Sequence, residues 1–202
     1  MKTRKAGKRH RLLLYRRTMD RLWIATLILG LLLGAIWLWL WVSETPILNP
    51  GNEIWLLAGS AVSLGFTLFA FVSRQAAYVQ PHRDHLRLVT PFLRLSISYK
   101  RIRNVHPAAF QQLFPPGKAS WAQRSLLDPF YGRTVVVVEL SSYPMSPYLL
   151  RLFLSPQMFS PQSSGFVFVV PDWMAFSTEV DSFRSAWMQA HKRRISKRSR
   201  GW

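Results

Sequence analysis

The chain has no cysteine among its 202 residues, which excludes disulfide bonds and thiolate metal sites. Acidic residues are also scarce, with nine Asp and Glu against 27 Lys and Arg and a formal net charge of +18. The acids beyond residue 75 are scattered and form no obvious pair for acid–base catalysis. Among the histidines only His82 and His85 lie close together, in a hydrophilic run typical of a turn. We therefore expect no catalytic residue, no metal and no cofactor, and no enzyme activity.

Two stretches, residues 22–42 and residues 54–72, contain no charged residue. As helices they would extend about 31 Å and about 28 Å, and a membrane has a hydrocarbon core of about 30 Å. The first stretch is longer than the core of a cleaved signal peptide, and no small-x-small cleavage site follows it. The sequence therefore predicts two transmembrane helices joined by a short loop, residues 43–53.

The basic residues are placed on one side of this predicted hairpin. Residues 1–21 carry nine Lys and Arg, whereas the loop at residues 43–53 carries none. Because basic flanks stay on the cytoplasmic side, we expect a multi-pass protein of the plasma (inner) membrane. Both termini should be cytoplasmic and the loop external.

Small residues recur at a spacing of four within both stretches. Such spacing lets two helix backbones approach closely. Two interpretations stay open: packing of the two helices within one hairpin, or a homodimer formed through one of these faces. The residues concerned are Gly30 with Gly34, Gly59 with Ser63, and Ala61 with Gly65.

Residues 75–191 are predicted to form one cytoplasmic domain of the mainly-β (α+β) class. Its strands should be antiparallel, and an amphipathic helix over residues 178–191, capped by Ser177 or Thr178, should close it. Val180, Phe183, Trp187 and Ala190 form the apolar stripe of that helix, which we expect to cover the sheet. Residues 106–133 read as an irregular insertion with one short helix at 120–127. The expected strands are 76–80, 85–89, 93–99, 134–140, 148–154 and 165–170.

Residues 86–92 and 97–105 carry a family resemblance. They contain a strand, a turn, a second strand and then the spacing Ile102-x-x-Val105. This run, directly after a predicted hairpin, resembles the bacterial pleckstrin-homology-like (PH-like) domain proteins of membranes. The resemblance covers roughly residues 75–192. It implies a curved antiparallel sheet or open barrel capped by the C-terminal helix, and it implies no particular ligand.

The charge surplus suggests partners for the predicted domain and its tails. Both basic tails, residues 1–21 and 192–202, are expected to meet anionic lipid, whereas nucleic acid is not expected because aromatic residues do not alternate with the bases. The insertion either patches the domain's own core or contacts a membrane or protein. The candidate contacts with a headgroup or partner are Lys100, Arg101 and Arg103, together with Lys118, Trp121 and Arg124.

These features favour a non-enzymatic, membrane-anchored scaffold or accessory subunit that binds a protein partner at the cytoplasmic face. Two other functions stay open. The first is a sensor of anionic lipid headgroups, which guanidinium groups bind well. The second is a small subunit of a transport or secretion complex, in which the small-residue faces of the hairpin would pack against a partner.

Overall fold

The computed structural model describes residues 6–43, 53–118 and 120–199. Nearly all of the expected external loop, residues 44–52, lies outside the described residues, as do the outermost parts of both basic tails. The chain forms two compact units. Unit 2 is residues 15–76, and unit 1 combines residues 1–14 with residues 77–202.

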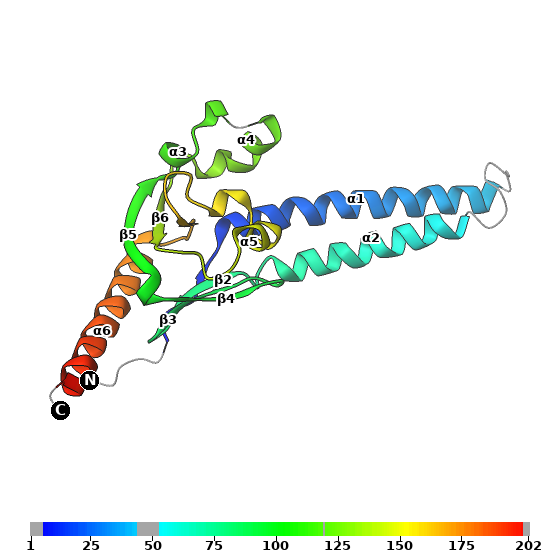
Figure 1. The fold of residues 1–202 in the computed structure, drawn as a ribbon. Coiled ribbons are helices and arrows are strands. Elements are labelled where there is room, and N and C mark those ends of the chain that lie inside the picture. The colour runs from blue at the N-terminus through cyan, green and yellow to red at the C-terminus, as the bar shows by residue number, and fades with distance from the viewer. Residues whose placement is uncertain (1–5, 44–52, 119, 200–202) are drawn as a thin grey trace. The chain divides into compact units, whose positions relative to one another are not determined.

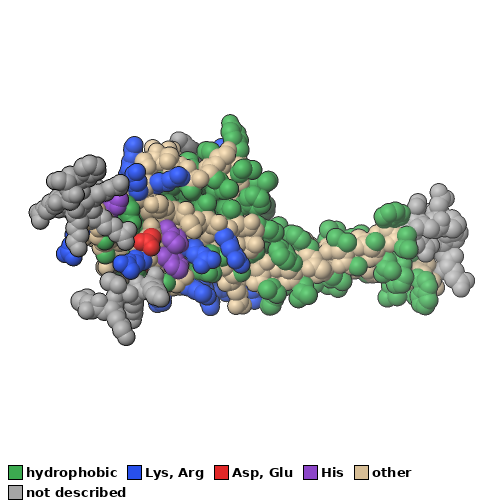
Figure 2. Space-filling model, turned by 60° about the horizontal axis from the view of Figure 1, so that its bottom comes forward, with side chains coloured by type: hydrophobic (Ala, Val, Ile, Leu, Met, Phe, Trp, Pro, Cys, Tyr) green, Lys and Arg blue, Asp and Glu red, His purple; other side chains and the backbone are tan. Residues whose placement is uncertain are grey.

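Unit 2 is a pair of long helices (Figure 1). Helix α1 spans Leu13–Ser43 and helix α2 spans Glu53–Ser73. Both are long and apolar enough to cross a membrane, as the two charge-free stretches predict. Figure 2 shows apolar side chains along the surface of the pair.

Small and hydroxyl-bearing residues line the contact between α1 and α2. The Ser60 hydroxyl donates to the Gly30 carbonyl over 2.8 Å, and the Ser63 hydroxyl donates to the Thr26 carbonyl over 2.8 Å. A Cβ atom added at Gly30 would lie 3.0 Å from the Leu64 side chain, so this glycine allows the close approach. Gly34 and Gly59 also face the partner helix, with Ser60 and Leu33 as their neighbours.

The third small-residue pair lies elsewhere on α2. Ala61 and Gly65 are exposed, and a Cβ atom added at Gly65 would meet nothing within 4 Å. At one end of the hairpin the Arg74 guanidinium pairs with the Asp20 carboxylate over 3.4 Å. Four of the six small residues therefore serve packing within the hairpin, and Ala61 and Gly65 do not.

Unit 1 contains two antiparallel sheets, and its described strands form no closed barrel. Alternation explains strand β3: Leu86 and Leu88 are buried while His85 and Arg87 are only half-buried. Strand β7 is buried at every position because both of its faces are covered. The first sheet is β1 (His10–Arg11), β2 (Tyr78–Pro81), β3 (His85–Val89) and β4 (Arg94–Ser98); the second is β5 (Ile102–Ala109), β6 (Thr134–Leu140) and β7 (Gly165–Phe168).

The predicted insertion at residues 106–133 is more regular than the sequence indicates. It holds the end of β5, helix α3 (Phe110–Leu113), helix α4 (Trp121–Leu127) and two short 3-10 turns. The predicted short helix is present, and Ser120 caps it: the Ser120 hydroxyl accepts from the backbone of Gln123, whose side chain accepts from the backbone of Ser120.

The strand predicted at residues 148–154 is wrong, because this segment is helix α5 (Pro147–Phe153). A short apolar run does not distinguish a strand from a buried helix by periodicity. The decisive residue is Pro147, which occupies the first turn, where its fixed φ suits a helix and its missing N–H costs nothing.

The final helix is longer than predicted. Helix α6 spans Trp173–Ser199, and the cap expected at Ser177 or Thr178 is wrong. The Asp172 carboxylate accepts a hydrogen bond from the Ala175 N–H over 2.9 Å instead, as an N-cap residue does. The helix extends past residue 191 because the basic segment beyond it consists largely of good helix formers.

Helix α6 packs against strands of both sheets. Phe176 and Val180 are fully buried, and the Phe176 ring lies 5.8 Å from that of Phe168 in β7 and 5.1 Å from His10 in β1. Trp187 is only half-buried, with its ring 6.4 Å from Tyr99. The main burial of α6 therefore comes from its first turns rather than from Trp187.

Replacing Phe176 with alanine should destabilise unit 1 by about 3–5 kcal/mol, because a buried phenyl ring leaves a cavity. The matched control is Met174→Ala on the same helix, since Met174 is 61% exposed. Denaturant unfolding of the full-length protein in detergent, followed by tryptophan fluorescence, measures both. Equal midpoints for Phe176→Ala and the wild type would contradict this packing.

Candidate interaction surfaces

Residues 6–13 belong to unit 1 rather than to a free basic tail. Ala6 forms a bridge with His82, and strand β1 pairs with β2 in the register His10 with Val79 and Arg11 with Tyr78. The Leu13 N–H then donates to the Val169 carbonyl over 2.9 Å. The expected tail at residues 1–21 therefore contains an edge strand that leads directly into α1.

This pairing defines two ends of unit 1. The hairpin end is the end where Leu12 precedes α1 and where Ala77 follows α2. The distal end is the end marked by Ala6 and His82. Leu12 follows Ala6 by six positions, which corresponds to about 20 Å of extended chain.

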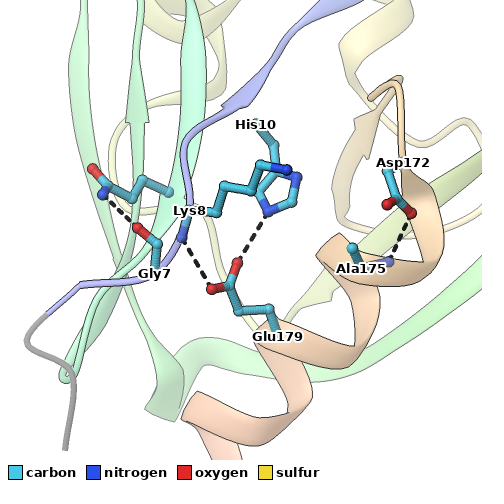
Figure 3. Close-up of polar contacts among 7 residues, drawn as sticks. Gly7, Lys8, His10, Asp172, Ala175 and Glu179 are labelled. Atoms are coloured by element: carbon cyan, nitrogen blue, oxygen red, sulfur yellow. Dashed lines mark hydrogen bonds and ion pairs between the residues drawn. The ribbon is translucent and has the colours of Figure 1, made fainter.

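A single carboxylate joins the edge strand to α6 (Figure 3). Glu179 accepts a hydrogen bond from the Lys8 N–H over 3.0 Å and contacts the His10 Nε2 atom over 3.0 Å. The His10 ring is 5% exposed. A Cβ atom added at Gly7 would lie 2.6 Å from the Glu179 carboxylate, so a side chain there would displace the carboxylate.

Three of the candidate contacts lie at the distal end. Tyr99 donates its hydroxyl hydrogen to the His82 carbonyl over 2.7 Å, which places the turn Tyr99–Arg101 beside His82. Lys100 and Arg103 are exposed. The Arg101 guanidinium is half-buried and donates to the Tyr143 carbonyl over 3.1 Å, so Arg101 has a structural role.

Other bases extend this surface. Arg83 is exposed in the turn after β2, and Lys192 and Arg193 are exposed on α6 beyond Trp187. We call Arg83, Lys100, Arg103, Lys192 and Arg193 the distal basic surface. Figure 2 shows Lys and Arg side chains spread over unit 1 with few acidic ones among them.

The titratable groups at the distal end reflect burial and this positive charge. Burial lowers the pKa of His82, and the positive charges of His85 and Arg87 lower it further; the two histidine rings are stacked 5.0 Å apart. Burial raises the pKa of Asp181, while Arg184 opposes the shift, and burial raises the pKa of Tyr99. In the part of the chain that the structure describes, no group of three His, Asp or Glu could hold a metal ion.

The remaining candidates lie on the connection between β5 and β6. The Phe110 N–H donates to the Arg133 carbonyl over 3.0 Å, so the connection leaves the second sheet at the start of β6, where Val136 pairs with Phe168. Val169, the next residue, accepts from Leu13. The connection is therefore at the hairpin end.

Most apolar residues of this connection fill unit 1 itself. Phe110, Leu127 and Phe130 are buried, which favours the interpretation that the insertion patches the core. Trp121 differs, because it is 86% exposed. Arg124 is also exposed and donates to the Pro116 carbonyl over 3.0 Å, and the side chain of Lys118 lies outside the described residues.

The five candidate contacts whose side chains the structure describes thus form no single site. Lys100, Arg101 and Arg103 precede or begin β5, and Trp121 and Arg124 follow its other end. The length of β5 between Arg103 and Ala109 corresponds to about 20 Å. Any one ligand of headgroup size can meet only one of these groups.

Sequence reasoning missed an exposed apolar face on α5. Tyr148 is 84% exposed, Leu152 is 74% exposed and Leu149 is 49% exposed. In the strand predicted at residues 148–154, neighbouring side chains would point to opposite faces of a sheet, so these three residues would not share one surface. Pro147 at a helix start was the signal that could have found the face.

No protein-family model, no curated protein sequence and no solved structure matches this chain.

Removing the Glu179 carboxylate should free the edge strand locally. A hydrogen bond to a charged group contributes about 1.5–3 kcal/mol, so Glu179→Ala should speed amide exchange in residues 6–12 about 10- to 100-fold. Hydrogen exchange of the full-length protein in detergent, read by mass spectrometry, measures this. Ser182→Ala, an exposed position on α6, is the control, and unchanged protection in Glu179→Ala would show that the carboxylate does not hold the strand.

Proposed function

We propose that this chain is a non-enzymatic protein of the plasma (inner) membrane, acting as a scaffold or accessory subunit on the cytoplasmic side. In this proposal α1 and α2 cross the bilayer with both chain ends inside, as the distribution of bases favours. Unit 1 is then a divergent PH-like domain. The order of its elements supports that assignment, since antiparallel strands come first and the final helix contacts strands of both sheets.

The observation that carries the proposal is the position of Lys100 and Arg103. They lie at the distal end, about 20 Å along the sheet from the residues that lead into the hairpin. A base that contacts headgroups of the adjacent leaflet belongs at the hairpin end. The distal position instead suits a partner in the aqueous phase.

The chemistry of the distal basic surface indicates an acidic protein partner. Guanidinium groups bind carboxylates with paired hydrogen bonds, and several bases in one area attract a negatively charged surface from a distance. Single-stranded nucleic acid would need exposed aromatic rings for stacking, and Trp187 and Tyr99 at this end are half-buried and buried. Attachment to a membrane raises the effective concentration of two membrane-bound partners, so weak contacts suffice.

A sensor of anionic headgroups is the alternative function. The exposed Trp121 and Arg124 at the hairpin end support it, because an indole and a guanidinium together suit the membrane interface.

Reversing the charge of the distal basic surface should abolish partner binding. The variant Lys100→Glu with Arg103→Glu tests it, and Arg94→Glu with Arg124→Glu makes the same change of charge at exposed positions of the hairpin end. Purification of each full-length protein from native membranes in mild detergent, with quantitative mass spectrometry, gives the bound partner.

We expect a stoichiometric acidic partner with the wild type and with the control pair, and its loss with the distal pair. The binding should weaken as salt increases. Retention of the partner by the distal variant would contradict the proposed surface. A protein that purifies alone, carrying anionic lipid that only the control pair loses, would establish the sensor instead.

A further inference from the structure

Helix α5 has an unusual distribution of apolar residues. Leu150 is fully buried against unit 1, as one expects of an amphipathic helix. The opposite side presents Tyr148, Leu149 and Leu152, which lie within about 100° of one another around the helix axis. Their exposed fractions of 84%, 49% and 74% are high for such side chains in a water-facing helix. Neither the core nor the distal basic surface accounts for them.

Other exposed apolar residues lie toward the same end of unit 1. Figure 1 shows α4 and α5 remote from the C-terminal half of α6. Trp121 on α4 is 86% exposed. The turn between β3 and β4 is also at this end, because Val89 pairs with both Tyr78 and Arg94, and Phe92 in that turn is 52% exposed.

The chain connects this end of unit 1 to the two predicted transmembrane helices through short segments. Strand β1 ends at Arg11 and α1 begins at Leu13, so no flexible linker intervenes. On the other side, Tyr78 follows Val72 by six positions, a distance of at most about 20 Å. The headgroup layer of each leaflet is about 5–8 Å thick, and a helix with its side chains is about 10–12 Å across.

The composition of the exposed face matches a membrane interface. Tyrosine and tryptophan favour the headgroup level, where the ring is apolar and one polar group stays hydrated. Arg151 is exposed on α5 and can meet a lipid phosphate. The sequence has no Asp or Glu between Glu139 and Asp172, and none between Asp84 and Asp128, so no carboxylate of these segments would be repelled by anionic lipid.

We propose that the apolar face of α5, formed by Tyr148, Leu149 and Leu152, inserts into the interface of the bilayer that the hairpin crosses, together with Trp121 and Phe92. This surface would fix the domain on the leaflet and leave the distal basic surface for the partner. The inference rests on the transmembrane part of the proposed function and on none of the residues proposed to bind the partner.

The test uses single-cysteine variants of the full-length protein in lipid nanodiscs. Because the native chain has no cysteine, one environment-sensitive fluorophore can be attached at Leu152→Cys or Tyr148→Cys. Met188→Cys on α6, at a residue 39% exposed, is the matched control on the other side of unit 1. Ile36→Cys in α1 reports on the hairpin itself. Lipids with a nitroxide at the headgroup or in the acyl chain, and aqueous iodide, are the quenchers.

We expect the labels at 152 and 148 to be quenched by the headgroup nitroxide and to lose iodide quenching, whereas the label at 188 should show the reverse. Quenching of 152 and 148 by iodide as strong as that of 188 would overturn the inference. Protection from both quenchers would also overturn it, because a protein would then cover the face. If the label at Ile36 fails to respond to the acyl-chain nitroxide, the transmembrane hairpin itself is wrong, which separates that failure from the failure of α5.

Discussion

The hydrogen bonds between β1 and β2 are the constraint on which the rest of the structure depends. They join residues just before α1 to residues just after α2, so the whole hairpin is an insertion between two neighbouring strands. Closing a loop of this length costs entropy, and the packing of α1 on α2 through Gly30, Ser60 and Ser63 offsets that cost. The pairing also gives unit 1 a direction, with one end where the chain continues into and returns from the hairpin and an opposite end at Ala6 and His82.

That direction separates the chemistry of the two ends. The exposed apolar residues of α4 and α5 lie toward the hairpin end, and Lys100 and Arg103 lie at the distal end. Helix α6 connects them: its buried Phe176 contacts β1 and β7, and Glu179 holds the backbone of Lys8.

The parts of the fold that follow from local patterns were predictable from the sequence. Charge-free stretches identify α1 and α2, alternation identifies β3 and β4, and Ser120 with Gln123 marks the start of α4. Helix α5 was not predictable by periodicity, because a run of seven mostly apolar residues fits either a strand or a helix. Strand β1 is only two residues long and is specified by pairing with residues almost seventy positions later, which no local pattern reveals.

The sequence predicts which types of residue could contact a ligand, but it does not predict which of them lie together. The bases and the exposed tryptophan are present, yet the register of β5 separates them, and register depends on long-range pairing. The sequence also gives no sign that Gly7 lies against Glu179, since a glycine that contacts a distant side chain looks like any other loop glycine. The separation of the bases from the exposed tryptophan is therefore visible only in the three-dimensional structure.

Disulfide trapping of β1 against β2 tests this account most directly. The pair Arg11→Cys and Tyr78→Cys faces across the strands, where Cα atoms lie about 4.5–5.5 Å apart and a disulfide forms without strain. Arg11→Cys with Gln80→Cys is offset by two residues and serves as the control. With a protease site placed within residues 44–52, the account predicts that the cleaved halves of the in-register variant stay joined until reduced. Separation of those halves without reductant, or equal linkage in the control, would contradict it.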